Sequence, residues 1–492
     1  MATATLALAL MRSGQLTASQ FLATCLDRIE QREAAVRAWI FLAAEAARQQ
    51  AIQSDALTLA EHEGRPSRSP IMQPLRGIPI AVKDIFATMD MPTAWGTSIY
   101  TGRYLTAEAE VVSRLQAAGA IILGKTVTTE LATAASGATC NPHNLAHTPG
   151  GSSSGSAAAV ADGMVPIAIG SQTMGSILRP AAYCGIFGFK PTFGRISRQG
   201  MMPVCDDLDH VGLFARSLED IQRVFTVLTV EANDGPMGDR GEPIVRANGE
   251  SPLATIQPME GLSSPECRLA WIQTLHWSQV EPVAQNQLHQ AIAVLKQAGI
   301  HIEVVTLPAI CHDYWDTVQR LCAYGLKTHH GKLIEQHREQ CSSLLQNWLQ
   351  RGQNIQPSAY EQARQSGAAY REAVSSILAQ YDAILTPVTS GPAPYGLATT
   401  GSPIFCGIWT LCGLPALNMP IGKTSKGLPL GCQLVGRWME DQRLLQIAAH
   451  CWQFLSPVWG GLNIPSSTTP ETGPFFPGSS KTASTRRRKF SD

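Results

Sequence analysis

The sequence predicts an α/β protein, because short apolar runs alternate along the chain with helical patterns. Gly77–Val82 and Ala120–Leu123 are almost wholly apolar, as strands buried on both faces of a sheet are. A helical pattern over Ala107–Ala118 separates these two runs, and Gly119 marks its end. The 492 residues are enough to bury a large core, and their number does not force a division into several domains.

Helices lead at the N-terminus. The opening MATATLALALMRSG predicts a short helix rather than a signal peptide, because no basic residue precedes its apolar run, which stops at Arg12. Leu16–Ala60 has helical apolar spacing, and Thr17 with Gln20 forms a capping box at its start. We therefore predict an N-terminal helical segment over residues 1–65.

The elements that follow support one α/β unit over residues 66–465. The pattern predicts a helix of small residues over Ser156–Asp162 and a buried strand over Val165–Gly170. It predicts a further helix that begins near Ser217. Three more strands (267–273, 301–307 and 382–388) are predicted in the second half, with a helix over 283–299 between the first two.

Three segments stand apart from this alternation. Residues 311–381 are almost wholly helical and polar, which predicts an insertion that forms part of a substrate pocket. Glu231–Pro265 is rich in Gly, Pro and Asp and predicts a long loop. Residues 466–492 are rich in Ser, Thr and Pro, which predicts a disordered tail, and its RRRK run is expected to be solvated.

The amino-acid composition indicates which kinds of partner and cellular environment to expect. The 38 basic and 38 acidic residues cancel, so nothing in the charge favours a nucleic acid or a membrane surface as partner, and a small neutral substrate fits better. No apolar run is long enough to span a bilayer. The 12 cysteines are scattered without a CxxC pair, which predicts reduced core residues of a cytoplasmic protein.

A serine and a lysine sit where they could do chemistry. Ser176 ends GSQTMGS, directly after a predicted strand, and such a turn of small residues can aim several backbone N–H groups at one point. Lys83 ends the buried run IAVK, where desolvation would lower its pKa and make it a base. The glycines of GGSSSG let the serine loop fold tightly and place a hydroxyl between the two, which gives a Lys-Ser-Ser relay.

Together these stretches resemble the amidase signature family of serine amidohydrolases. The resemblance is carried by NPHNLAHTPGGSSSGSAAAVADG, GSQTMGSILRPAAYCGIFGFKPTFGRISRQG and LDHVGLFARSLED, and upstream by RGIPIAVKDIF and LQAAGAIILGKTVTTELA. Downstream it includes DAILTPV, LCGLPALNMPIG and GLPLGCQLVG, so only the helical insertion and the tail fall outside it. It implies a large mixed, mostly parallel twisted sheet sandwiched between helices.

The resemblance also implies roles for single residues. Lys83 matches the family's lysine, Ser152 its bridging serine after a cis peptide bond, and Ser176 its nucleophile. Ser153 would assist by hydrogen bonding, and the oxyanion would be bound by the backbone N–H groups of Thr173, Met174, Gly175 and Ser176. The implied reaction is hydrolysis of a small-molecule amide through an acyl-serine, with no metal or organic cofactor.

The sequence departs from the family pattern at four positions. Ser154 stands where glycine is usual and Met174 where glycine or alanine is usual, while Gln172 replaces an aspartate and Leu178 an arginine. If the two charged residues normally form an ion pair, losing both together costs little free energy, because neither charge is left without a partner. We therefore expect an uncharged support for the site, with Arg179 outside it.

Other interpretations of the same residues are weaker. Gly151–Gly155 also fits G-x-S-x-G, the nucleophile elbow of α/β-hydrolase esterases, with Ser153 attacking, but the preceding NPHNLAHTP predicts a loop where that motif needs a strand. No phosphate-binding motif is present. The histidines of the insertion are not accompanied by a second cysteine pair or an HExxH motif, as a metal site would require. Packing therefore explains them better than metal binding.

An amidase-like subunit of a tRNA-dependent amidotransferase is the remaining alternative. That subunit usually keeps the aspartate and arginine that are absent at 172 and 178, so a stand-alone amidase is preferred. A homodimer stays open. Specificity is expected to depend on the insertion and on loops near Trp95, Cys205–Asp209 and Ile408–Trp409.

Overall fold

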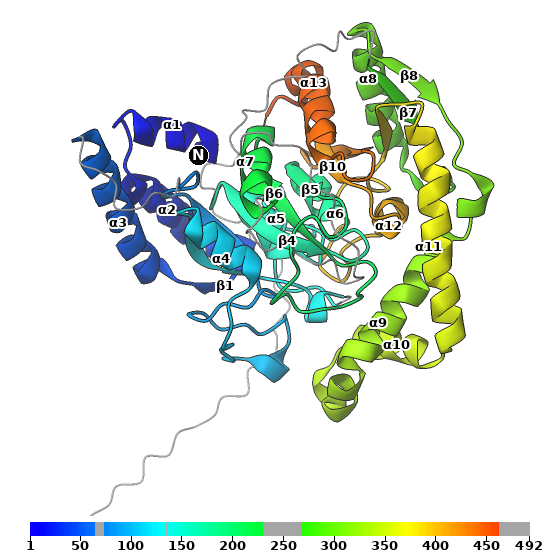
Figure 1. Ribbon diagram of the computed structural model, residues 1–492, viewed down its shortest axis with the longest axis horizontal. Helices are drawn as coiled ribbons and strands as arrows, with labels where there is room; N and C mark the ends of the chain where they lie inside the picture. Colours follow the sequence, from blue (N-terminus) through cyan, green and yellow to red (C-terminus); the bar gives the residue numbers. More distant parts are fainter. Residues whose placement is uncertain (64–72, 134, 230–266, 462–492) are drawn as a thin grey trace, which may run out of the picture.

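A single mixed sheet runs through the computed structural model, which describes residues 1–63, 73–133, 135–229 and 267–461 (Figure 1). Within these residues the sheet has eleven strands in the order β1-β3-β2-β4-β6-β5-β10-β11-β9-β7-β8. The strands are β1 (Trp39–Leu42), β2 (Pro79–Lys83), β3 (Ile121–Thr126), β4 (Ile167–Gln172), β5 (Phe187–Lys190), β6 (His210–Ala215), β7 (Arg268–Trp271), β8 (His301–Val304), β9 (Ala383–Pro387), β10 (Ala416–Lys423) and β11 (Pro429–Val435).

Helices cover the sheet. They are α1 (Ala4–Arg12), α2 (Ala18–Val36), α3 (Ala44–His62), α4 (Glu110–Ala117), α5 (Ser154–Ala161), α6 (Leu178–Cys184), α7 (Leu218–Thr229), α8 (Pro282–Gln297), α9 (Tyr314–Gln336), α10 (Ser343–Gln353), α11 (Pro357–Leu378), α12 (Ile404–Leu411) and α13 (Asp441–Trp459). The predicted α/β class, with a large mixed sheet flanked by helices, is confirmed.

The part of the sheet around β2 is parallel. β2 pairs in parallel with both β3 and β4. Every residue of these three strands is buried, as expected for strands covered on both faces. The carboxyl ends of β2 and β4 therefore lie side by side at one edge, where α/β proteins commonly place their sites.

The sheet contains more antiparallel pairs than the sequence predicts. Parallel pairing also joins β7 to β8 and to β9, but the remaining neighbours are antiparallel. β10 and β11 follow each other closely in the chain and form a hairpin, which requires antiparallel pairing.

Helix α5 lies close against the sheet because its residues are small. All eight residues of SGSAAAVA are buried. A Cβ on Gly155 would lie 2.2 Å from the Ala38 carbonyl oxygen and 2.5 Å from the Val127 nitrogen, so only glycine fits there. The close approach holds the serine loop that precedes α5 against β3 and β4.

The predicted N-terminal segment is helical except for one strand. Both hydrogen bonds of the expected capping box between Thr17 and Gln20 are present at the start of α2. Trp39–Leu42, however, forms β1, an edge strand that pairs antiparallel with β3. Its four residues are too few to interrupt the helical pattern of the surrounding sequence visibly.

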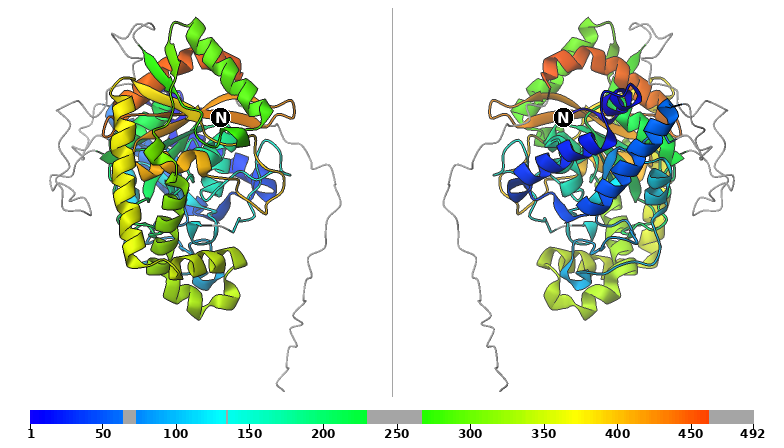
Figure 2. Two further views of the ribbon diagram at one scale, coloured as in Figure 1. Left: turned by 90° about the vertical axis from the view of Figure 1, so that its right-hand side faces the viewer. Right: turned by 90° about the vertical axis from the view of Figure 1, so that its left-hand side faces the viewer.

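Residues 311–381 form α9, α10 and α11, which lie at the opposite side of the molecule from α1, α2 and α3 (Figures 1 and 2). They contact two loops of the α/β unit. Glu130 accepts a hydrogen bond from the Ser342 backbone nitrogen (3.1 Å) and another from its hydroxyl. Tyr360 and Arg364 both donate to the Asp207 carboxylate, at 2.5 and 3.0 Å.

The histidines of this insertion are engaged locally. The His330 ring nitrogen lies 2.7 Å from the Pro203 carbonyl oxygen, and His329 lies 3.1 Å from Asp206. Both contacts join α9 to the loop that leads into β6.

The predicted loop over Glu231–Pro265 and the tail at 466–492 lie outside the described residues. All 12 cysteines are described, and each is buried and unpaired. Within the described ranges, no helix is both long and apolar enough to cross a bilayer.

Candidate active site

Lys83 lies at the centre of the candidate site, at the carboxyl end of β2. Its amine lies 2.7 Å from the Ser152 hydroxyl oxygen and 2.8 Å from that of Ser171, and its side chain is 0 % exposed. Ser171 belongs to β4, the parallel neighbour of β2, so the sheet brings it to the lysine. The amine is thus held between two neutral hydroxyl groups.

Burial weakens proton binding by the Lys83 amine. It lowers the pKa of Lys83 well below the usual range, and the Asp209 carboxylate opposes this shift. The adjacent Asp84 is turned to another cation, since its carboxylate lies 3.2 Å from the Lys125 amine. Among the described residues Lys83 has no carboxylate within ion-pair distance, so the neutral amine required of a base is favoured.

Ser152 lies on the loop between β3 and α5. The peptide bond between Gly151 and Ser152 is cis, as the family resemblance implies. The Ser152 carbonyl accepts a hydrogen bond from the Thr129 nitrogen (3.2 Å), which fixes the loop to the segment after β3. Ser152 is 2 % exposed, so its hydroxyl faces the lysine in a dry environment.

The Ser153 hydroxyl holds the serine loop on the sheet. It donates to the Ser171 carbonyl (3.2 Å) and accepts from the Ser171 nitrogen (3.3 Å). No strand precedes Ser153, because residues 141–153 contain only turns and isolated bridges. The nucleophile-elbow interpretation is therefore wrong, since that motif needs a strand directly before its serine.

Ser176 lies on the turn between β4 and α6, together with Thr173, Met174 and Gly175. No acceptor within the described ranges takes a hydrogen bond from the backbone N–H groups of these four residues. The Ser176 hydroxyl also makes no hydrogen bond to a described residue, and the side chain is 8 % exposed. Four consecutive free amides beside a free hydroxyl are what an oxyanion site needs.

Gln172 supports this turn without a charge. Its side-chain oxygen accepts from the nitrogens of Ile177 (2.9 Å) and Leu178 (3.1 Å), which closes the turn at its far end. Its amide nitrogen donates to the Thr410 hydroxyl at 2.9 Å, and that hydroxyl lies 3.1 Å from the Met174 carbonyl oxygen. The glutamine thus does by neutral hydrogen bonds what we expected of an uncharged support.

Two further residues fix the turn. The Thr173 hydroxyl donates to Asp209 at 2.6 Å, and Asp209 also accepts from the nitrogens of Val204 and Cys205. A Cβ on Gly175 would lie 2.9 Å from the Pro403 Cβ, too close for a side chain. The turn is packed on one side by the segment that leads into α12 and held on the other by a buried carboxylate.

Arg179 corrects one expectation. Its side chain is 4 % exposed, and its guanidinium donates to the Gly151 carbonyl oxygen at 2.5 Å. Gly151 directly precedes Ser152, so a cation does lie against the serine loop. The support of the site is therefore uncharged at Gln172 and Leu178 but not as a whole, because the arginine that is missing at 178 is present one position later.

The structure thus brings Lys83 and Ser152 into direct contact and places Ser153 behind them. The contact between Ser152 and Ser176 stays a prediction, as do the catalytic roles. Sequence reasoning missed the roles of Ser171, Asp209 and Thr410, although it named Asp209 in a loop expected to affect specificity. Ser171 could have been found, because polar residues at the ends of adjacent parallel strands meet at one sheet edge.

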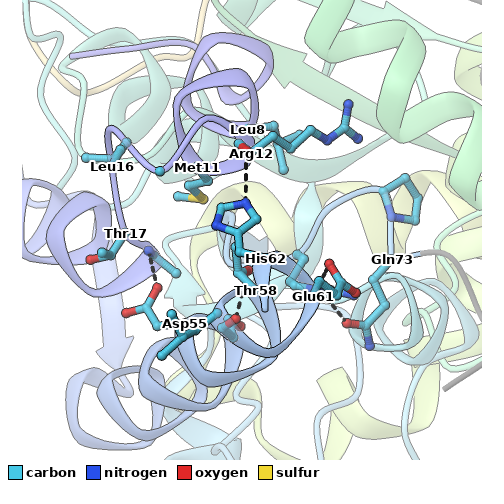
Figure 3. Close-up of a pocket in the computed structure, with 16 residues that line it drawn as sticks. Leu8, Met11, Arg12, Leu16, Thr17, Asp55, Thr58, Glu61, His62 and Gln73 are labelled. Atoms are coloured by element: carbon cyan, nitrogen blue, oxygen red, sulfur yellow. Dashed lines mark hydrogen bonds and ion pairs between the residues drawn. The ribbon is translucent and has the colours of Figure 1, made fainter. Parts of the chain in front are cut away.

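A separate cavity of about 620 Å³ lies among α1, α2 and α3 (Figure 3). Its polar groups are engaged with one another: Asp55 accepts from the Ala18 nitrogen at 2.6 Å, and Arg76 pairs with Glu61 at 2.8 Å. None of the predicted site residues lines it, so it does not belong to the candidate active site.

Known proteins are similar to this chain over most of its length. The family model described as Amidase matches residues 20–445. The A-subunit of the glutamyl-tRNA(Gln) amidotransferase of Symbiobacterium thermophilum is 32% identical over 476 residues, which cover 89% of this chain and 94% of that protein. The protein of the same name from Legionella pneumophila is 32% identical over 468 residues, which cover 87% and 92%.

Solved structures of amidases are also similar to this chain. A crystal structure of an amidase matches with a TM-score of 0.78 and 28% identity, covering 92% of this chain and 99% of that one. The native peptide amidase of Stenotrophomonas maltophilia matches with a TM-score of 0.75 and 27% identity, covering 91% and 96%. The glutamyl-tRNA(Gln) amidotransferase A-subunit of Thermotoga maritima, at 24% identity and a TM-score of 0.70, shares the fold over 89% and 94%.

Proposed function

The chain belongs to the amidase signature family, and on that premise we propose that it is an amidohydrolase that cleaves a carboxylic amide through an acyl-serine intermediate. One observation carries the proposal: a fully buried lysine amine lies 2.7 Å from the hydroxyl of Ser152 and has no carboxylate partner in the described part of the chain. An amine in that position is a base whose first proton donor is Ser152.

In the first half of the reaction, Ser176 attacks the amide carbonyl carbon. Its hydroxyl proton passes to the Ser152 oxygen while the Ser152 proton passes to neutral Lys83, which becomes an ammonium. The carbonyl oxygen takes the negative charge and is bound by the backbone N–H groups of residues 173–176. Ser152 then gives its proton to the leaving nitrogen and regains one from Lys83, and the C–N bond breaks.

The second half repeats the relay with water. Water attacks the acyl carbon and loses its proton through Ser152 to Lys83, and Ser176 leaves with a proton returned along the same path. The products are a carboxylic acid and ammonia or an amine. No step draws on a metal or an organic cofactor.

The helical insertion is proposed to form part of the substrate pocket. Its contacts with Glu130 and Asp207 are the support for this. Glu130 directly follows Thr129, whose backbone nitrogen donates a hydrogen bond to the Ser152 carbonyl. Asp207 lies two residues before Asp209, whose carboxylate accepts a hydrogen bond from Thr173 of the oxyanion turn. The insertion therefore meets the two loops that flank the proposed chemistry.

The second candidate is a component of an amidotransferase, which the names of the curated relatives favour. Against it, Gln172 and Leu178 replace the aspartate and arginine usual in that component. Such a component would need its partners, whereas a stand-alone enzyme would work by itself. The peptide amidase and the other amidase are similar along nearly the whole chain, which agrees with an independent hydrolase.

The discriminating experiment is amide hydrolysis by the purified chain alone. Ammonia or amine release should be measured over a panel of primary amides, N-substituted amides and peptide amides, with Ser176→Ala as the blank. Turnover that the blank lacks supports the stand-alone amidohydrolase. No turnover by the chain alone, together with glutaminase activity when amidotransferase partner subunits are added, would replace it with the second candidate.

A further inference from the structure

Arg179 is a buried cation without an anionic partner in the described part of the chain. One of its terminal nitrogens donates to the Gly151 carbonyl (2.5 Å) and to the Thr400 hydroxyl (3.2 Å), and the other to the Gly401 carbonyl (2.8 Å). Its Nε atom is buried without a hydrogen-bond partner in the described structure. No carboxylate in the described ranges forms an ion pair with it, so its charge is met only by neutral oxygens.

Such an arrangement is costly unless the hydrogen bonds are good. Desolvating a guanidinium without a counter-ion is unfavourable, and burial lowers the pKa of Arg179 accordingly. Charge-assisted hydrogen bonds to carbonyl oxygens are short and strong, and the planar fork of arginine suits several acceptors at once. These hydrogen bonds therefore fix the guanidinium and its three acceptors firmly relative to one another.

The acceptors and the arginine come from the segments that the relay must align. Arg179 lies in the first turn of α6, three residues after Ser176, and its backbone nitrogen donates to the Gly175 carbonyl at 3.0 Å. Gly151 directly precedes Ser152. One side chain thus connects the turn that carries the proposed nucleophile to the loop that carries the proposed bridging serine.

The same guanidinium also fixes a third segment over the site. A Cβ on Gly151 would lie 2.7 Å from the Thr400 Cγ2, so residue 400 lies directly against the serine loop. Pro403, three residues on, packs against Gly175 of the oxyanion turn. The segment from Thr400 to Pro403 therefore covers both catalytic loops, and Arg179 holds its first two residues.

We propose that Arg179 is a positioning residue, which holds Ser152 in register with Ser176 by binding the Gly151 carbonyl and the Thr400–Gly401 segment together. This inference rests on the proposed function, since register matters only if the two serines exchange a proton. It also explains how the chain tolerates Leu178, because the neighbouring position supplies the guanidinium.

The test compares Arg179→Met and Arg179→Lys with the wild type in two readouts. In steady-state kinetics on the best amide, we expect kcat to fall about 10²-fold with little change in KM, because displacement of a reacting group by an ångström costs about that much. Lysine, with one nitrogen, cannot reach all three acceptors and should restore only part of kcat. In hydrogen exchange, residues 149–156 should exchange faster in both variants.

Arg216→Met is the matched control, because this guanidinium also donates to backbone carbonyls, those of Val160, Val165 and Ala2. It should lower stability while leaving kcat and the exchange of residues 149–156 unchanged. An Arg179→Met protein with wild-type kcat and wild-type loop exchange would overturn the inference, as would an equal loss of kcat in Arg216→Met. If Arg179→Met does not fold, Arg179→Lys carries the same comparison.

The exchange readout separates the two proposals. If the wild type hydrolyses no amide, the proposed function fails, and faster exchange of the loop in the Arg179 variants still supports the tether. If the wild type is active and the variants match it in both readouts, the tether alone fails.

Discussion

At the scale of single residues, the candidate serines Ser152, Ser153 and Ser176 differ in the groups that they contact. Ser152 contacts the Lys83 amine, Ser153 bonds only to the backbone of Ser171, and Ser176 has a free hydroxyl next to free amides within the described structure. These differences predict a ranking of activity losses on substitution.

Ser176→Ala should lower amide turnover by about 10⁴-fold or more, because removing a nucleophile abolishes the acyl-enzyme route. Ser152→Ala and Lys83→Ala should lower kcat by several orders of magnitude, since each breaks the relay. Ser153→Ala should be milder, because its hydroxyl only fixes the loop. Steady-state kinetics on folded variants checks the ranking. A dead Ser153→Ala beside an active Ser176→Ala would show that the roles are assigned wrongly.

Ser171→Ala should lower kcat/KM by about tenfold, the usual worth of one hydrogen bond that orients a reacting group. The Lys83 amine would keep Ser152 but lose its other hydroxyl partner. Ser154→Ala is the control, because its hydroxyl donates to the Val127 carbonyl (3.3 Å) and does not touch the amine. Equal kcat/KM for the two variants would mean that Ser171 does not orient Lys83.

The sequence could indicate Lys83, Ser152 and Ser176 because the family motifs around them are nearly continuous. It could not place Arg179, since a shift of one position along a helix turns a side chain by about 100° and so changes what it reaches. Ser171 and Asp209 were missed because their roles arise from neighbouring strands and loops, not from their own motif.

At the scale of secondary-structure elements, helices with clear apolar spacing were predictable: α1 and α5 lie close to their expected ranges, and α2 begins at its predicted capping box. β1 was not expected because four residues carry almost no periodic signal. The insertion is helical as predicted, but the sequence could not show which loops it would contact, since Glu130 and Ser342 are 212 residues apart along the chain.

Ser342→Ala should loosen α10 and its attachment. Its hydroxyl accepts from the Leu345 nitrogen (3.2 Å) as an N-terminal cap and donates to Glu130, so two bonds are lost. The loss of a cap costs about 0.5–2 kcal/mol, and hydrogen exchange over residues 343–353 should rise by the corresponding factor.

Ser343→Ala is the control for that experiment, because this neighbouring serine is exposed and its hydroxyl makes no hydrogen bond among those found in the described chain. Its exchange should match the wild type. If Ser342→Ala also matches the wild type, the contact with Glu130 does not hold the insertion in place.

At the scale of the whole molecule, the parallel centre of the sheet was predictable from its apolar runs, whereas the antiparallel pairing on both sides of β5 was not. Strands such as β6 and β10 follow loops whose direction no local pattern fixes. The predicted N-terminal and α/β units share this one sheet through β1, so a boundary near residue 65 stays a prediction.

Burial of Lys83 predicts a pH dependence of stability. Its pKa is lowered in the folded protein, while an unfolded lysine has a pKa of about 10.4, so between these two values only the unfolded chain binds the proton. Stability then rises with pH across this window, by up to about 1.4 kcal/mol per pH unit from this group. Below the folded pKa both states are protonated, and the dependence on pH stops.

Lys83→Met isolates this contribution. Denaturant unfolding of both proteins between about pH 7.5 and 9.5 should show a free-energy difference, wild type minus variant, that increases with pH. A difference that stays constant or decreases over this range would mean that Lys83 is charged in the folded protein, and a neutral base would then be ruled out at those pH values.

The account depends most on Ser176 being a nucleophile that Lys83 activates. The direct measurement is to treat the purified protein and its Lys83→Met variant with a fluorophosphonate probe, digest both, and locate the label by mass spectrometry. We expect the wild type to carry the label on Ser176 and the variant to carry almost none. Label on Ser153, or equal labelling of Ser176 in the two proteins, would contradict the Lys83–Ser152–Ser176 relay.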